Sequence, residues 1–397
     1  MNELVKLSRR DEIAIVTIDN PPVNALSPGV PEGILACIQE AAANGSVKAI
    51  VVIGAGTTFI AGADIREFGK IVAGEAAASN LPEIICKIED CPKPVVMALH
   101  GTAFGGGLEV AMGGHFRVMA SDGLVGQPEV KIGLIPGAGG TQRLPRLAGI
   151  ELALEMCVFG EPIGAKAAFE SGLVNRIIEG DLLEGAIAFA REAIHKPMSK
   201  TRDRRGKLKD VDPRYFSAAI DKANATRRGQ IAPLEAVDAV EASIRLFDRG
   251  MEMEREAFVR CLHSPQSKAM IHAFFGERTV AKIPAIGKDV QTYKIKKAAV
   301  VGAGTMGGGI AMNYANAGIP VILKETDQKA LDKGINTIRS NYANSVRKGR
   351  FDWAEMERRM AFITPQTTYD GFEDVDVVTE AVFEGMELKK QVFAELD

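Results

Sequence analysis

Residues 101–109 of the chain read GTAFGGGLE, and a second glutamate follows twenty positions later in GQPE, residues 126–129. A glycine-marked turn precedes each acid, Glu109 and Glu129. Upstream, residues 59–64 read FIAGAD, a turn of small residues that could aim backbone N–H groups at a ligand. Two carboxylates and free amide donors suit proton transfer beside a carbonyl whose negative charge must be stabilised. This combination predicts an enzyme.

The bulk composition indicates a globular protein. The chain has 397 residues, enough for two or three domains, with 46% hydrophobic and 25% charged residues. A formal net charge of -3 gives no general reason to expect nucleic acid or an anionic membrane as a partner. No apolar run approaches the roughly 18 residues of a membrane span, and the N-terminus has no signal-peptide pattern. Five cysteines without a CxxC pair favour a reduced compartment, so we expect a soluble, cytoplasmic protein.

The pattern of apolar residues divides the chain into three segments. Up to about residue 195, apolar strands alternate with helical stretches, which is typical of a layered α/β domain. We expect strands at residues 13–18, 49–53 and 94–99, and helices at 31–43 and 76–88. From about 196 to 290 the pattern changes to that of a helical connector, and a new α/β unit begins near residue 296.

The middle segment opens with a basic stretch, residues 200–209, which lacks apolar periodicity. We interpret it as a solvated linker, and contact with the phosphate groups of a ligand is the alternative. Beyond it, apolar residues recur at helical spacing. They are Leu234, Val237, Val240, Ile244 and Phe247. A helical face of this kind is expected to pack on a neighbouring segment.

Residues 302–307 read GAGTMG, the GxGxxG pattern of dinucleotide-binding turns. A strand precedes it, an apolar helix follows, and Glu325 stands 23 residues beyond Gly302 after a second strand. Glycines let the backbone approach a pyrophosphate, the helix N-terminus attracts it, and the acid accepts from the ribose 2′-OH. The expected NAD contacts are Gly302, Gly304, Thr305, Met306, Gly307 and Glu325. The acid favours NAD over NADP. The alternative to cofactor binding is a glycine turn that only packs a helix on a strand.

Residues 1 to about 190 resemble the crotonase (enoyl-CoA hydratase/isomerase) superfamily. The matching motifs are residues 61–64, 105–109, 127–129 and 136–142. The rest resembles the connector and the NAD-binding half-domain of 3-hydroxyacyl-CoA dehydrogenases, in the order found in multifunctional enzymes of fatty-acid β-oxidation. The resemblance implies an α/β fold with three parts. They are a crotonase-like spiral of ββα units at 1–195, a linker and helical connector at 196–290, and an incomplete Rossmann domain at 291–397.

By this resemblance, the N–H groups of Ala63 and Gly106 form an oxyanion hole for an acyl-CoA thioester, with CoA as part of the substrate. Glu129 transfers a proton at C2 and Glu109 helps to activate water, so the pair favours an enoyl-CoA hydratase. Δ3,Δ2-enoyl-CoA isomerisation, thioester hydrolysis and a non-catalytic fragment that binds CoA and NAD are the alternatives. Substrate contacts are expected at Val23, Ala25, Ala61 and Asp64, although Asp64 could serve only to hold its own turn.

The dehydrogenase part departs from the family that it resembles. Those enzymes use a histidine that follows the NAD-binding strands, whereas all five histidines of this chain precede the glycine motif, and their scatter argues against a metal site. Glu380 resembles a family acid near the nicotinamide ribose, so we expect NAD binding without oxidation of a 3-hydroxyacyl-CoA. We also expect a fragment of a longer protein and a monomer in preference to an oligomer. Its location is expected to be the cytoplasm of a bacterium or the peroxisome of a eukaryote.

Overall fold

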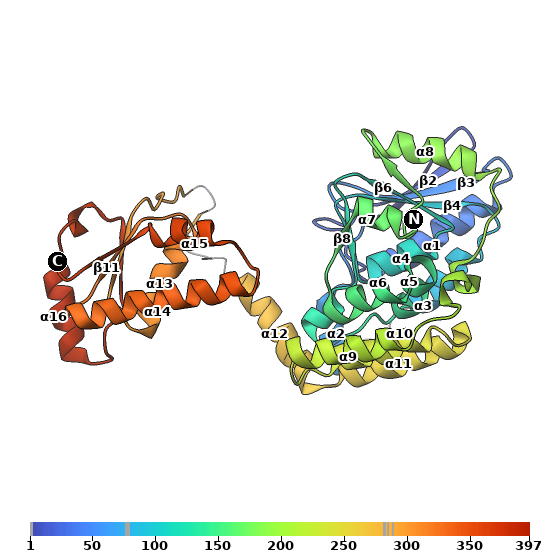
Figure 1. Cartoon of the computed structure of the whole chain (residues 1–397). Coiled ribbons are helices and arrows are strands. Elements are labelled where there is room, and N and C mark those ends of the chain that lie inside the picture. Colours follow the sequence, from blue (N-terminus) through green and yellow to red (C-terminus); the bar gives the residue numbers. More distant parts are fainter. Residues whose placement is uncertain (1–2, 76–79, 281–282, 284–285, 288–289) are drawn as a thin grey trace. The chain divides into compact units, whose positions relative to one another are not determined.

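The computed structural model describes residues 3–75, 80–280, 283, 286–287 and 290–397 (Figure 1). The chain divides into two compact units, Met1–Ile283 and Pro284–Asp397. Each unit has its own buried apolar core. Part of the helix predicted at 76–88, residues 76–79, lies outside the described residues. No helix in the described part of the chain combines the length and the apolarity that crossing a bilayer requires.

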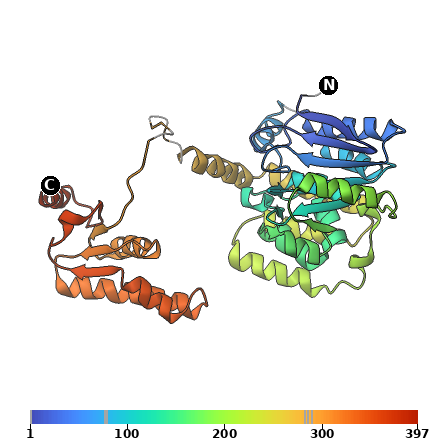
Figure 2. The ribbon, with the colours of Figure 1, turned by 90° about the horizontal axis from the view of Figure 1, so that it is seen from above.

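Among the described residues, the first unit contains a six-stranded sheet with the strand order β1-β2-β3-β4-β6-β9. Its strands are β1 (Val5–Arg10), β2 (Ile13–Ile18), β3 (Ala49–Gly54), β4 (Val95–Leu99), β6 (Phe116–Ala120) and β9 (Arg176–Ile178). β1 and β2 pair antiparallel, and the later pairs are parallel. Figure 2 shows the N-terminal strands, in blue, as one layer. The strands predicted at 13–18, 49–53 and 94–99 are confirmed, and burial on both faces explains their continuous apolar runs.

Helices cover both faces of this sheet. On one face, α8 (Leu182–Ala193) packs through Ala186 and Phe189 into a cluster with Val51 and Val96. The other face carries the larger core. Its helices include α1 (Val30–Ala43), α2 (Ile65–Val72), α3 (Leu81–Glu89), α4 (Gly106–Gly113), α5 (Gly140–Ala148), α6 (Ile150–Leu154) and α7 (Ala165–Glu170). The helix predicted at 31–43 is therefore confirmed as α1.

A small second sheet places the two glutamate motifs side by side. It consists of β5 (Thr102–Phe104), β7 (Leu124–Gly126) and β8 (Ile163–Gly164). β5 and β7 are parallel, with Phe104 opposite Gly126. β5 leads into α4, and β7 leads into the 3-10 turn η1 (Glu129–Ile132). Because parallel strands end at the same edge of a sheet, both motifs emerge at one place.

The basic stretch at 200–209, interpreted as a solvated linker, leaves several side chains exposed but is also anchored to the rest of the first unit. It forms two 3-10 turns, η3 (Thr201–Asp203) and η4 (Gly206–Leu208). The Thr201 hydroxyl donates to the carbonyl of Met112 (2.9 Å), and the Leu208 side chain is buried. Basic side chains can bond to carbonyl groups through their ends while their aliphatic stems cover apolar surface, so a run of cations need not be surrounded by water.

The predicted connector is helical and is part of the first unit, where Val237 and Val240 of its apolar face pack on the core as expected. Its helices are α9 (Arg214–Thr226), α10 (Ala232–Ala242), α11 (Phe247–Leu262) and α12 (Pro265–Val280). Val237 and Val240 are fully buried in the core of the first unit. The apolar spacing nevertheless spans two helices, since α10 ends in a turn tightened by the bond from the Ser243 N–H to the Val240 carbonyl (3.1 Å). Phe247 then begins α11.

The second unit is a parallel sheet with the strand order β12-β11-β10-β13. Its strands are β10 (Ala298–Val301), β11 (Val321–Lys324), β12 (Ile363–Gln366) and β13 (Val377–Glu380). Its helices are α13 (Thr305–Asn316), α14 (Gln328–Arg347), α15 (Trp353–Met360) and α16 (Met386–Leu396). The chain runs outward from β10 to β12 and then returns to β13 on the other side of β10. The glycine motif therefore lies at a topological switch point, where open α/β sheets bind their ligands.

Candidate active site

Two backbone N–H groups from separate segments lie side by side, those of Ala63 and Gly106. Leu26 donates to the carbonyl of Gly62 (2.9 Å), which fixes the loop that carries Ala63. Gly106 opens α4, and a Cβ built on it would lie 3.7 Å from the Ala63 nitrogen. Neither N–H donates to another residue in the described part of the chain. Two free donors, one of them at a helix N-terminus, can stabilise a developing oxyanion.

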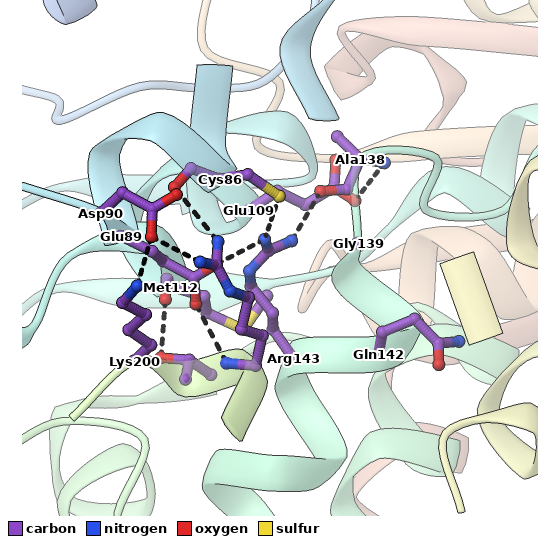
Figure 3. Close-up of polar contacts among 12 residues, drawn as sticks. Cys86, Glu89, Asp90, Glu109, Met112, Ala138, Gly139, Gln142, Arg143 and Lys200 are labelled. Atoms are coloured by element: carbon purple, nitrogen blue, oxygen red, sulfur yellow. Dashed lines mark hydrogen bonds and ion pairs between the residues drawn. The ribbon is translucent and has the colours of Figure 1, made fainter. Parts of the chain in front are cut away.

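Glu109 stands in the first turn of α4, three residues after Gly106. Its side chain is buried, and Oε1 accepts from the N–H groups of Ala138 and Gly140, both at 2.7 Å. Figure 3 shows the carboxylate facing Ala138. Burial raises the pKa of Glu109, while the two amide donors and the Arg143 guanidinium act in the opposite direction. A buried acid with a raised pKa is suited to general acid–base catalysis.

Glu129 opens η1 and lies against Gly105. Gly105 has a φ of +52°, and a Cβ built on it would lie 2.7 Å from Glu129 Oε1, so only glycine fits. With its amide nitrogen turned toward the acid, Gln127 donates to both carboxylate oxygens (3.0 and 3.2 Å). Burial, and then the charge of Glu109, raise the pKa of Glu129 well above its usual range. Because Gly105 adjoins Gly106, this carboxylate lies next to the two backbone donors.

A third carboxylate, that of the fully buried Glu254, reaches the same loop from α11. Its Oε1 accepts from the Gly139 N–H (2.6 Å), and its Oε2 accepts from the Thr141 N–H (2.9 Å) and the Thr141 hydroxyl. The pKa of Glu254 is raised to about 8, mainly because the side chain is buried. Sequence patterns did not single out Glu254. The available signal was its spacing, since Gly250, Glu254 and Ala257 share the buried face of α11.

A buried ion pair supports the same loop from the side of α3 (Figure 3). Arg143 donates to Glu89 Oε2 (2.7 Å) and to the carbonyl of Ala138 (3.2 Å). Both charged side chains are almost fully buried. The backbone N–H of Arg202 donates to Glu89 Oε1 (3.0 Å), so the basic stretch contributes to the pair. Removing one partner of such a pair typically costs about 3–5 kcal/mol, because an uncompensated charge remains inside.

The residues expected along the CoA part of the substrate lie on two joined loops. The Ala61 N–H donates to the carbonyl of Val23 (3.1 Å), and the Ala25 carbonyl accepts from a side-chain amide (2.7 Å). Asp64 is the N-cap of α2, where it accepts from the Arg66 N–H (3.1 Å). The Arg66 side chain also bonds to Asp64 and lowers the pKa of that acid. Asp64 therefore holds its own turn, and its contact with substrate stays a prediction.

The glycine motif of the second unit has the geometry of a dinucleotide-binding turn. Gly302 has a φ of +106°, and a Cβ built on Gly307 would lie 1.8 Å from the Gly302 carbonyl oxygen, so α13 can pack on β10 only through glycine. A Cβ on Gly304 would meet nothing within 4 Å, so the backbone is open to a ligand just before α13. Glu325 Oε2 accepts from the Ala303 N–H (2.9 Å), which places the acid beside the turn. These residues fit a dinucleotide.

The other residues expected to contact the cofactor surround this turn. Thr305 and Met306 begin α13, and both are exposed. Glu380 ends β13 opposite Val301, the last residue of β10, so it lies at the same edge of the sheet as the glycines. Its Oε2 pairs with Lys389 (3.1 Å). The expected residues are thus gathered at one end of the sheet.

A sequence model of the family described as "Enoyl-CoA hydratase/isomerase" matches residues 8–234, more than half of the chain. The chain belongs to the enoyl-CoA hydratase/isomerase family. Residues 297–397 match the model described as "3-hydroxyacyl-CoA dehydrogenase, NAD binding domain". The order of the two matches confirms the resemblance found in the sequence. It also confirms the α/β class, with a crotonase-like part followed by an NAD-binding Rossmann part.

Relatives within the family have the same order of parts. The peroxisomal bifunctional enzyme of Cavia porcellus is 37% identical over 97% of this chain and 54% of that protein. The peroxisomal fatty acid beta-oxidation multifunctional protein MFP2 of Arabidopsis thaliana is 37% identical over 98% of this chain and 55% of that protein. The chain thus spans about half the length of these relatives. A solved enoyl-CoA hydratase from Mycobacterium avium subsp. paratuberculosis K-10 shares the fold, with a TM-score of 0.51 and 22% identity over 70% of this chain and 97% of that one.

Proposed function

We propose that the first unit is an enoyl-CoA hydratase that adds water to 2-enoyl-CoA thioesters in fatty-acid β-oxidation. The proposal is carried by the position of two carboxylates, the buried Glu109 and the half-buried Glu129, beside the free N–H groups of Ala63 and Gly106. The name of the Arabidopsis thaliana relative, a fatty acid beta-oxidation multifunctional protein, supports the same process. The CoA part of the substrate is assigned to the loops of Val23, Ala25, Ala61 and Asp64.

Hydration would begin with polarisation of the thioester. Its carbonyl oxygen accepts hydrogen bonds from the N–H groups of Ala63 and Gly106, and the conjugated C3 becomes open to attack by water. The donors are fixed before substrate arrives, so they stabilise the charge that develops without reorganising. The loss of one such donor typically costs about 10²–10³ in rate.

The two acids would divide the proton transfers. Because the charge of Glu109 raises the pKa of Glu129, the pair holds one shared proton more readily than two isolated acids would. We assign water activation to Glu109, which takes a proton as the water oxygen bonds to C3. We assign to Glu129 the delivery of a proton to C2. A single water held between both acids would add to one face of the double bond, so we propose syn addition.

Isomerisation of a 3-enoyl-CoA to a 2-enoyl-CoA is the second candidate reaction. One observation favours it: the raised pKa of Glu129 and its place beside the backbone donors would let this acid alone move a proton between C4 and C2. The family description names both activities. A 3-enoyl-CoA substrate distinguishes them, because only isomerisation first creates the conjugated thioester and its ultraviolet absorbance.

We further propose that the second unit binds NAD⁺, with the pyrophosphate at the first turn of α13. Glu325 would accept from the adenosine ribose, and Glu380 would lie near the nicotinamide ribose. Bound NAD⁺ supplies a hydride acceptor. No histidine follows His272 in the sequence, so we do not expect this chain to oxidise a 3-hydroxyacyl-CoA. The hydratase product is nevertheless a substrate for that reaction class, and the relatives favour a peroxisomal location if the source is eukaryotic.

The decisive experiment is a hydration assay of the purified chain with crotonyl-CoA, followed by the loss of enoyl-thioester absorbance. Wild-type protein should hydrate the substrate, and Glu109→Gln and Glu129→Gln should each lose most of the rate. An exposed acid, Glu151, provides the matched control as Glu151→Gln. Full activity in both site variants would show that the site is assigned wrongly, and an inactive wild-type protein would refute the proposed function.

A further inference from the structure

The 136–141 loop, sequence PGAGGT, presents successive backbone N–H groups to two different carboxylates. Glu109 accepts from Ala138 and Gly140, both at 2.7 Å. Glu254 accepts from the two N–H groups that alternate with these, those of Gly139 (2.6 Å) and Thr141 (2.9 Å). The loop is therefore held between an acid of the proposed catalytic pair and an acid of the connector.

These N–H groups include the first donors of α5, which have no partner inside that helix. Glu254 is fully buried, and a buried carboxyl group is costly unless hydrogen bonds satisfy it. Glu254 is satisfied only by this loop: the Gly139 N–H, and the N–H and hydroxyl of Thr141, are its bonds among the described residues.

The rest of α11 is shaped to approach the same loop. A Cβ built on Gly250 would lie 2.0 Å from Oε1 of Gln142, so glycine allows the helix to come this close. On the loop side, a Cβ built on Gly137 would lie 2.6 Å from the Phe258 ring. Gly250, Glu254 and Phe258 follow one another at intervals of four residues, so over two turns one face of α11 meets the loop and the first turn of α5.

We propose that Glu254 is a positioning residue for the hydration reaction. By fixing alternate amides of the 136–141 loop, it holds the other two amides where they orient the Glu109 carboxylate. The connector thus acts on the chemistry through the loop and without contact with substrate. This inference rests on the proposed hydratase function.

The test is the kcat and KM of crotonyl-CoA hydration by Glu254→Gln. The amide keeps the size of the side chain, but its NH₂ group cannot accept a hydrogen bond, so one end loses its bond, either that from the Thr141 N–H or that from the Gly139 N–H. A misplacement of about 1 Å can cost about 10² in rate, so we expect a loss of kcat of that order. KM should change little, because Ala63 and Gly106 lie on other segments. The matched control is Glu256→Gln, an exposed acid on the same helix, which should retain full activity.

A double-mutant cycle separates positioning from general damage. If Glu254 acts through Glu109, Glu254→Gln should cost little in a Glu109→Gln background, whereas independent structural damage would multiply the two losses. Wild-type kcat in Glu254→Gln, or multiplied losses, would overturn the inference. If Glu254→Gln does not fold, Thr141→Val removes one partner of Glu254 and should lower kcat in the same non-additive way. A folded Thr141→Val with wild-type kcat would then overturn it. An inactive wild-type protein would instead overturn the function on which the inference rests.

Discussion

Gly105 lies so close to Glu129 that a Cβ on the glycine would stand 2.7 Å from Oε1 of the acid. The contact joins the turn that presents the Gly106 N–H to the acid proposed to protonate C2. Two independent constraints therefore require glycine at position 105: its φ of +52° and the position of the carboxylate. A side chain at this position must move the acid, the turn or both.

Gly105→Ala is accordingly expected to lower kcat for crotonyl-CoA hydration by about 10² or more, since displacement near the reacting groups has effects of this size. The control is Gly180→Ala, because Gly180 has a φ of +80° but open space around its Cβ position. That variant carries similar backbone strain and should keep its kcat. The midpoint of thermal unfolding should be measured for both variants together with kcat. An equal loss of kcat in the two variants would mean that backbone strain alone explains the effect.

The exchange of Glu129 for Gln should lower kcat by about 10²–10⁴, which is the usual range for a general acid or base. KM should change less, because the amide keeps the size of the side chain. Glu109→Gln should fall in the same range, because its amide oxygen can still accept from Ala138 and Gly140 as Oε1 does, whereas the side chain can no longer take up a proton. Steady-state kinetics of both variants against wild type provide the measurement.

The free energy of unfolding of the first unit should depend on pH, because the buried side chain of Glu254 keeps its proton in the folded state. Its folded pKa of about 8 lies above the ordinary value of 4.5 for a glutamate, so between these values the folded state retains a proton that the unfolded state has lost. The free energy of unfolding contributed by this group therefore falls as pH rises through that interval. Urea unfolding at pH values near 5 and 8 should show a smaller difference between wild type and Glu254→Gln at the higher pH. A difference that grows with pH would contradict this assignment, and Glu256→Gln should show no such trend.

Val240→Asp should destabilise the first unit by on the order of 3 kcal/mol or more, because it removes a buried apolar side chain and places a carboxyl group in its position. Val240 is fully buried in the core of the first unit, whereas Leu246, four residues beyond the end of α10, is 72% exposed. Leu246→Asp is therefore the control and should be nearly neutral. Thermal unfolding tests stability, and sedimentation of both variants tests whether the exposed connector surface leads to association.

NAD⁺ binding should depend on Gly307 and not on Gly309. A Cβ on Gly307 would lie 1.8 Å from the Gly302 carbonyl oxygen, so Gly307→Ala must separate α13 from β10. A Cβ on Gly309 would meet nothing within 4 Å, so Gly309→Ala tests the same substitution in the same helix without a clash. Calorimetric titration should detect NAD⁺ binding to wild type and Gly309→Ala and none to Gly307→Ala. The absence of binding to wild type would mean that the turn is only a packing device.

Much of the site could be predicted because its information is local in the sequence. Glycine turns and adjacent acids mark Glu109, Glu129 and the dinucleotide turn, and short apolar runs mark β2, β3 and β4. Glu254 could not be found in this way, because its partner Gly139 is 115 residues away and α11 resembles an ordinary charged helix. The anchoring of the basic stretch at 200–209 was missed for a related reason. Its cations bond to carbonyl groups of distant segments, which composition does not reveal.

The shared amides of the 136–141 loop bear on how this protein can be divided for experiments or for gene engineering. The motifs that identify a hydratase end near residue 142, and the region matching the family ends at residue 234. An excised version designed to either limit would lack residue 254 and would leave two inward-facing amides without their acceptor. A minimal hydratase should therefore extend through the end of α11 at Leu262, and shorter versions should be poorly active even where they fold.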